Sequence, residues 1–155
     1  MGVTDTDLVK DGEGLRLCTY LDTMGIKTTC YGYNLQSHTK SQIEAAGGNY
    51  NTMMQVGGCT TQSVCNKLLE TEMGSARAGK VRVYGSSVGC RDADAVLVDF
   101  VYNLGEGGAR GFPSMNTAIK RQDWNTAAYE MGNSAYCRQV GRRCTRNQNY
   151  LRGCN

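Results

Sequence analysis

The sequence predicts an α+β protein, with a small strand-containing part near the N-terminus and helices after it. Between residues 15 and 33, apolar and polar residues alternate on both sides of a turn at 22–25, which is typical of a β-hairpin. After residues 60 and 92, apolar residues recur at spacings of three and four, which is typical of amphipathic helices. A chain of 155 residues, with 40% hydrophobic and 20% charged residues, can form a sizeable core and is not disordered.

Local signals define the elements before residue 60. The first dozen residues predict a short helix, which Thr4 or Asp5 can cap and to which Leu8 and Val9 give an apolar side. Aspartate and glycine supply the turn chemistry of the hairpin. Residues 47–58 are rich in Gly and Asn, so we expect a loop there.

The elements after residue 60 are expected to be helices. A long helix begins after a threonine cap at position 60 or 61, and a second runs from Asp92 to a C-cap at Gly105. A Gly-rich turn follows to residue 111, and Pro113 suits the first turn of the next helix. Further helices complete the chain, and we expect Phe100 and Trp124 to lie in their core.

Eight cysteines form an even set, which favours four disulfides and an oxidising compartment. A zinc site would need paired CxxC spacings or nearby histidines, but neither occurs, and His38 is the sole histidine. Cys18 and Cys30 lie symmetrically about residue 24, so we expect a cross-strand disulfide between them. The residues assigned to disulfides are Cys18, Cys30, Cys59, Cys65, Cys90, Cys137, Cys144 and Cys154.

The net charge is +3, but basic residues are concentrated near the C-terminal end. No acidic residue follows Glu130, whereas five arginines do: Arg138, Arg142, Arg143, Arg146 and Arg152. Such a segment suits an anionic polymer such as a cell wall or a nucleic acid, or it forms a solvated helix face. Because Tyr150 is the one aromatic residue among these arginines, nucleic-acid binding is poorly supported. No stretch approaches about 18 consecutive apolar residues, so we expect no membrane span.

Few residues could carry catalysis. A Cys–His pair or a Ser–His–Asp triad would depend on His38, which lies in a polar stretch and is expected at the surface. The remaining candidates are Glu13 after the first helix and Asp22 in the hairpin turn, with Thr28 able to share a water molecule with Asp22. A glycosidase needs one protonated and one ionised carboxyl group. Surface glutamates and turn aspartates are also common, so these residues alone leave both interpretations open.

Three segments resemble the active-site region of phage-type lysozymes, glycoside hydrolase family 24. They are EGLR at 13–16, YLDTMG at 20–25 and TTCYG at 28–32. The resemblance continues with TTQS at 60–63, YNLG at 102–105, GF at 111–112, and DW at 123–124 followed by AA at 127–128. It covers essentially the whole chain, and the ordered set is specific although each piece alone is not.

The resemblance implies a bilobal lysozyme-like fold in which residues 1–155 form a single domain. A β-containing lobe would span approximately 13–58, an interlobe helix 60–80, and a helical lobe 81–155 together with 1–12. The sugar polymer would lie in the cleft between the lobes.

The resemblance also implies a muramidase. Such an enzyme hydrolyses the β-1,4 bond between N-acetylmuramic acid and N-acetylglucosamine in bacterial peptidoglycan, and it needs no metal or organic cofactor. Glu13 would be the general acid, and Asp22 with Thr28 would position the attacking water, which leads to inversion at the anomeric carbon. Arg143, from the last helix, would lie against the catalytic glutamate. Substrate contacts would come from Gly32, Asn34, Tyr102 and Asn103.

Two positions depart from the Gly-x-Gly-His stretch that ends the family's hairpin. Cys30 replaces the first glycine and Tyr33 replaces the histidine. That histidine is structural in the family, so its loss affects lobe packing more than the chemistry. The Cys18–Cys30 bridge would hold the hairpin in place beside the site. The remaining expected pairs are Cys137–Cys144 around the turn before the last helix, Cys59–Cys65 across a helix start, and Cys90–Cys154 by elimination.

We therefore expect a secreted, bacteriolytic monomer in its mature form, with peptidoglycan as its partner and no nucleic acid. Phage lysis is one setting in which such an enzyme acts. The first alternative is a non-catalytic cationic protein of lysozyme fold that binds bacterial envelopes through its arginines. The others are a lysozyme-shaped inhibitor or scaffold without turnover, and a related enzyme that prefers chitin oligomers.

Overall fold

The computed structural model describes residues 2–155 and divides them into two compact units. One unit holds the chain up to Leu8 together with Ser75–Asn155, and the other is Val9–Gly74. Helices make up most of the chain, and the described strands all lie between residues 16 and 34. The predicted α+β class, with strands near the N-terminus and helices after them, is confirmed.

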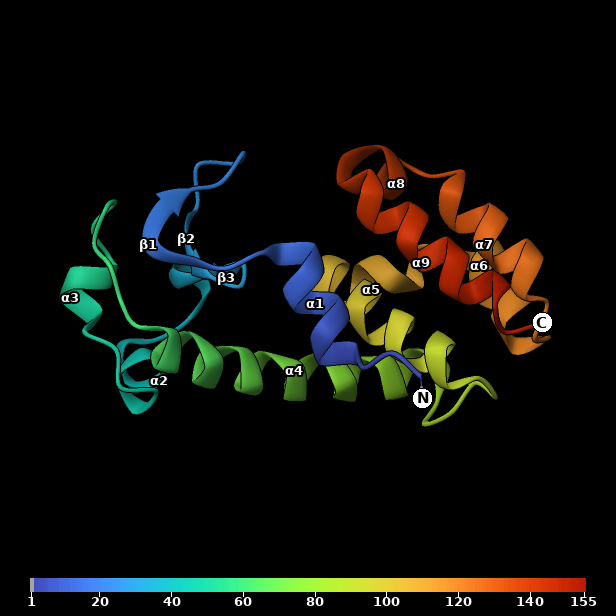
Figure 1. The fold of residues 1–155 in the computed structure, drawn as a ribbon, viewed down its shortest axis with the longest axis horizontal. Coiled ribbons are helices and arrows are strands. Elements are labelled where there is room, and N and C mark those ends of the chain that lie inside the picture. The colour runs from blue at the N-terminus through green and yellow to red at the C-terminus, as the bar shows by residue number, and fades with distance from the viewer. Residues whose placement is uncertain (1) are drawn as a thin grey trace. The chain divides into compact units, whose positions relative to one another are not determined.

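The unit Val9–Gly74 contains a three-stranded antiparallel sheet of order β1-β2-β3 (Figure 1). Its strands are β1 (Arg16–Leu21), β2 (Lys27–Cys30) and β3 (Tyr33–Asn34). A 3-10 turn, η1 (Leu35–Ser37), and two short helices, α2 (Lys40–Ala45) and α3 (Tyr50–Met53), follow. The expected loop at 47–58 is thus wrong in its middle, because the Asn49 side chain accepts a hydrogen bond from the Thr52 amide and caps α3.

Two helices contain residues of both units. In α1 (Asp5–Glu13) the Thr4 hydroxyl accepts a hydrogen bond from the Asp7 amide at 3.2 Å, which confirms one of the two expected caps. In α4 (Gln62–Tyr84) the Thr61 hydroxyl accepts a hydrogen bond from the Val64 amide at 3.3 Å. The helix continues through its two glycines to Tyr84.

The other unit is helical. Its further elements are α5 (Arg91–Arg110), α6 (Pro113–Lys120), α7 (Trp124–Gly132), α8 (Ala135–Val140) and α9 (Arg142–Arg152). The sequence predicts that the second long helix ends at Gly105. The regular helix is interrupted there, but α5 does not end until Arg110. Gly105 leaves the helical conformation (φ 76°, ψ 165°), a backbone that favours glycine, but the chain is helical again up to Arg110. The expected Gly-rich turn is therefore a kink followed by another helical turn.

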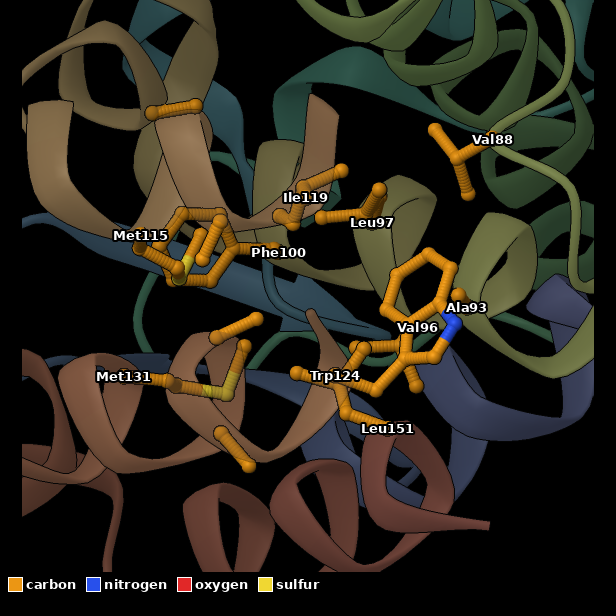
Figure 2. Close-up of a cluster of buried hydrophobic side chains, with 14 of the residues drawn as sticks. Val88, Ala93, Val96, Leu97, Phe100, Met115, Ile119, Trp124, Met131 and Leu151 are labelled. Carbon is orange, nitrogen blue, oxygen red and sulfur yellow. The ribbon is translucent and has the colours of Figure 1, made fainter. Parts of the chain in front are cut away.

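Buried apolar side chains from α5, α6, α7 and α9 form the core of this helical unit (Figure 2). Phe100 is fully buried and Trp124 is 4% exposed, which confirms both as core residues. Pro113 occupies the first turn of α6, as expected. Within residues 2–155, no helix combines the length and the apolar character needed to cross a membrane.

Four disulfides connect the described cysteines, two within each unit. Cys90–Cys154 and Cys137–Cys144 confirm two expected pairs. The Cys18–Cys30 and Cys59–Cys65 pairings are wrong, because the bonds are Cys18–Cys59 and Cys30–Cys65.

The physical reason for the correction is an irregularity in β1. Cys30 is opposite Arg16, and Thr28 is opposite Tyr20, so β1 advances four residues where β2 advances two. Cys18 falls inside this bulge and is not opposite Cys30. It pairs instead with Cys59, in a segment that runs along β1. There the Thr19 amide donates to the Gly58 carbonyl at 2.9 Å, and the Thr60 amide donates to the Leu17 carbonyl at 2.8 Å.

The arginine-rich tail is not uniformly solvated. Asp99 of α5 is fully buried, and its carboxylate accepts two hydrogen bonds from Arg143, at 2.6 and 3.1 Å. Arg146 donates to the same carboxylate at 3.0 Å, and the Asn147 amide donates at 2.9 Å. Two of the five arginines therefore belong to an internal ionic network, whereas Arg138, Arg142 and Arg152 are exposed.

We predict that Asp99→Asn destabilises the protein by about 3–5 kcal/mol, because it leaves two guanidinium groups without their buried counter-charge. Urea unfolding followed by circular dichroism measures this loss. Glu70→Gln, an isosteric change on the exposed face of α4, is the matched control and should stay within about 0.5 kcal/mol of the wild type. A loss below about 1 kcal/mol for Asp99→Asn would show that the network does not stabilise the fold.

Candidate functional site

Glu13 ends α1, and its carboxyl group lies directly against the backbone of Gly32. A Cβ atom at position 32 would overlap the Glu13 Oε1 atom and would lie 2.8 Å from its Cδ. Gly32 also has a φ of 68°, in the left-handed region. Glycine is therefore required here twice, for its backbone conformation and for the space that the carboxyl group occupies.

Asp22 is held in the turn between β1 and β2 by its own backbone neighbours. Its Oδ1 atom accepts hydrogen bonds from the amides of Met24 at 2.8 Å and Ile26 at 2.9 Å. The Asp22 amide donates to the Ile26 carbonyl at 3.0 Å, which closes the turn. The second carboxylate oxygen, Oδ2, makes no hydrogen bond with the part of the chain that the structure describes.

Thr28 is tied to the same carbonyl group as Asp22. Its hydroxyl lies 2.8 Å from the Ile26 carbonyl oxygen, and the side chain is 5% exposed. A carbonyl oxygen can only accept, so the Thr28 hydroxyl must donate its proton there. The lone pairs of that hydroxyl then stay available for a donor such as water.

Asn34 lies opposite Thr28 in the register of β2 and β3. Its side-chain oxygen already accepts hydrogen bonds from the amides of Gln36 and Ser37, at 2.8 and 3.1 Å, and so caps η1. The side-chain NH₂ group, which donates none of these bonds, is the part of Asn34 that can reach a ligand.

His38 is not the surface residue that the sequence predicts. Its ring stacks on Tyr33, with centroids 4.1 Å apart, and its side chain is 15% exposed. One ring nitrogen interacts with the Asn34 carbonyl at 2.6 Å, and the other with the Glu72 carboxylate of α4. Burial, and after it the charge of Glu72, raises the pKa of Tyr33 to about 12. Tyr33 and His38 together thus connect the end of the sheet to α4.

Cys30 holds the end of β2 in an unusual conformation. Its φ is 58°, in the left-handed region that non-glycine residues rarely adopt. The side chain is 1% exposed and is bonded to fully buried Cys65 in the first turns of α4. Cys30, at a position where the resembling family has glycine, thus adopts a conformation that favours glycine, and its side chain attaches the sheet to α4.

The candidate residues do not all belong to one unit. Glu13, Asp22, Thr28, Gly32 and Asn34 lie in the unit Val9–Gly74. Three others belong to the helical unit, with Tyr102 and Asn103 partly exposed on α5 before its kink and Arg143 bound to Asp99 as described above. The roles expected of all these residues stay predictions.

Sequence reasoning overlooked Tyr20 of β1. It pairs with Thr28 across the hairpin, and the guanidinium carbon of Arg16 lies 3.7 Å from its ring centroid. The signal was available, because Tyr20 precedes Asp22 by two residues inside the strand that leads to the turn.

A family model described as phage lysozyme matches residues 10–147 of the chain. The match contains Glu13, Asp22 and Thr28, and it extends through both compact units.

We predict that Gly32→Ala destabilises the protein by about 1–3 kcal/mol more than Gly57→Ala does, because an added methyl group must displace the Glu13 carboxyl group. Gly57 is the matched control, since its φ of 89° carries the same left-handed strain while nothing lies within 4 Å of an added Cβ. Urea unfolding of the two variants measures the difference. Equal losses would mean that the contact with Glu13 imposes no constraint.

The disulfide connections predict an order of stability. Replacing Cys30 and Cys65 by serine opens a loop with a sequence separation of 35 and should lower the free energy of unfolding by about 4 kcal/mol. The same change at Cys137 and Cys144, with a separation of 7, should lower it by about 2 kcal/mol. Unfolding in urea measures both losses. Peptide mapping without reductant checks the connections themselves, and a peptide that links Cys18 to Cys30 would contradict them.

Proposed function

The chain belongs to the phage lysozyme family, a family of glycoside hydrolases that act on peptidoglycan, and we propose the specific reaction that it catalyses. The reaction is hydrolysis of the β-1,4 bond between N-acetylmuramic acid and N-acetylglucosamine, with inversion at the anomeric carbon. Glu13 is the general acid of this reaction, and Asp22 with Thr28 binds the attacking water.

The observation that carries this proposal is the shared attachment of Asp22 and Thr28 to the Ile26 carbonyl. Because the Thr28 proton is used on that carbonyl, Thr28 accepts one hydrogen of a bound water molecule, and Asp22 Oδ2 accepts the other. Both hydrogens of the water then point to the protein, so that an oxygen lone pair is left for attack on the anomeric carbon. This arrangement suits a carboxylate that acts as general base.

Glu13 supplies the second half of the chemistry. Its proton passes to the glycosidic oxygen as the bond from that oxygen to the anomeric carbon breaks. On the opposite face of the sugar ring the water oxygen bonds to the same carbon, and its proton passes to Asp22. Contact with Gly32 restricts where the Glu13 carboxyl group can lie, and a general acid must be held within hydrogen-bonding distance of the oxygen it protonates.

Substrate contacts extend from this centre. In our proposal Gly32 lets the sugar approach the backbone beside Glu13, and the free NH₂ group of Asn34 donates a hydrogen bond to it. Tyr102 and Asn103 bind the polymer from α5, and Arg143 supports the catalytic glutamate. The segments that carry Gly32, Tyr102 and Asn103 resemble the family pattern, which supports these three assignments.

Four disulfides in a chain of this length support an oxidising compartment, as for a protein that is secreted or that acts during lysis. We propose a bacteriolytic role there. The protein would act as a monomer.

The test is Glu13→Gln, which keeps the shape of the side chain but removes its acid. We expect the hydrolysis rate of soluble peptidoglycan strands to fall by about 10²–10⁴-fold, because general acid catalysis contributes that much. Proton NMR of the reaction follows the rate and also the new anomeric signal, which should begin as the α form. Asp22→Asn should lower the rate in the same way.

Glu44→Gln is the control, since Glu44 is an exposed glutamate of α2, and its rate should equal that of the wild type. A first product in the β form would exclude inversion. If Glu13→Gln kills bacteria as well as the wild type does, the protein acts as a cationic envelope binder and the proposal is wrong.

A further inference from the structure

Tyr20 belongs to a row of side chains that crosses the sheet. Its partner in the β1–β2 register is Thr28, and the partner of Thr28 in the β2–β3 register is Asn34. Residues directly opposite one another in antiparallel strands project from the same face of a sheet. Tyr20, Thr28 and Asn34 therefore share a face, and the function proposed above places the water and the sugar on that face.

Tyr20 also lies within the electrostatic range of both carboxyl groups. Burial raises its pKa most, the charge of Arg16 lowers it, and the charges of Glu13 and Asp22 raise it further. The two acids come from different elements, the end of α1 and the hairpin turn. The charges of both acids therefore reach Tyr20, which agrees with its place in the row that contains Thr28. With its pKa raised, the hydroxyl keeps its proton and can donate it to a ligand.

The ring is held while the hydroxyl stays available. The Arg16 guanidinium lies over the ring face at 3.7 Å, a cation–π contact that limits rotation of the side chain. Within residues 2–155 the hydroxyl forms no hydrogen bond, and no buried side-chain oxygen or nitrogen lacks one. The Tyr20 hydroxyl must therefore reach solvent.

From this geometry we infer that Tyr20 is a further substrate-contacting residue: its hydroxyl donates a hydrogen bond to the sugar whose anomeric carbon reacts. Arg16 is its positioning residue, because it acts through the ring and leaves the hydroxyl free. The inference rests on the proposed function, since that function defines which sugar lies on this face of the sheet.

The experiment uses Tyr20→Phe, which removes only the hydroxyl and keeps the ring over which Arg16 lies. We expect kcat/KM on soluble peptidoglycan strands to fall 10–100-fold, with the thermal midpoint and the pH–rate profile unchanged. Tyr129→Phe removes a hydroxyl from a tyrosine that is 63% exposed on α7, and it should leave kcat/KM unchanged. Arg16→Met should lower kcat/KM by less than Tyr20→Phe does, because the hydroxyl is still present.

A binding measurement separates this inference from the proposed function. Glu13→Gln and the double variant Glu13→Gln/Tyr20→Phe are titrated with a muropeptide-derived tetrasaccharide by calorimetry, and the double variant should bind at least fivefold more weakly. If the wild type hydrolyses nothing but the binding difference is found, the reaction is wrong and the contact stands. Equal binding by the two variants overturns the contact. A shifted pH–rate profile for Tyr20→Phe also overturns it, since Tyr20 would then act on the acids and not on the sugar.

Discussion

The close approach of the Gly32 backbone to the Glu13 carboxyl group is the constraint on which the rest of the site depends. It requires that α1 end at the place where the chain between β2 and β3 passes, and that this chain adopt a left-handed conformation at Gly32. Any element that fixes the end of β2 therefore also limits the position of the acid. Contact with the Gly32 backbone thus limits where the Glu13 carboxyl group can lie.

Two disulfides and one non-covalent contact attach the sheet to α4 and to the segment before it. Cys30–Cys65 joins the end of β2 to α4, and Cys18–Cys59 joins β1 to the segment before that helix. The stacked pair of Tyr33 and His38 connects β3 to Glu72 of α4. Cys30 and Tyr33 are the two departures from the family pattern, and both thus help to attach the sheet to α4. A small sheet cannot bury enough apolar area to fix itself, and such attachments compensate for that.

The Ile26 carbonyl accepts hydrogen bonds from both Asp22 and Thr28 in the hairpin. It accepts the proton of the Thr28 hydroxyl, so the lone pairs of that hydroxyl are left. The amides of Met24 and Ile26 bind Asp22 Oδ1, so the other carboxylate oxygen is left, and both remaining groups accept and do not donate. Two acceptors of this kind orient a bound water molecule with both of its hydrogens toward the protein. Tyr20, whose hydroxyl can donate, lies in the same row and adds the opposite kind of hydrogen bond. Acceptors for water and a donor for sugar can thus share one face of the sheet.

The sequence by itself determined the α+β class, the hairpin with its turn at Asp22, the capped start of α4, the core position of Trp124 and the family, because these depend on residues close together along the chain. It also indicated two of the disulfides. Only the tertiary structure decided the other two, since a β-bulge shifts Cys18 out of register with Cys30 and no spacing rule reveals a bulge. The same holds for the contact of His38 with Glu72 and for the buried pairing of Arg143 with Asp99. Their partners are distant in sequence, and only folding brings the charges and rings within reach of one another.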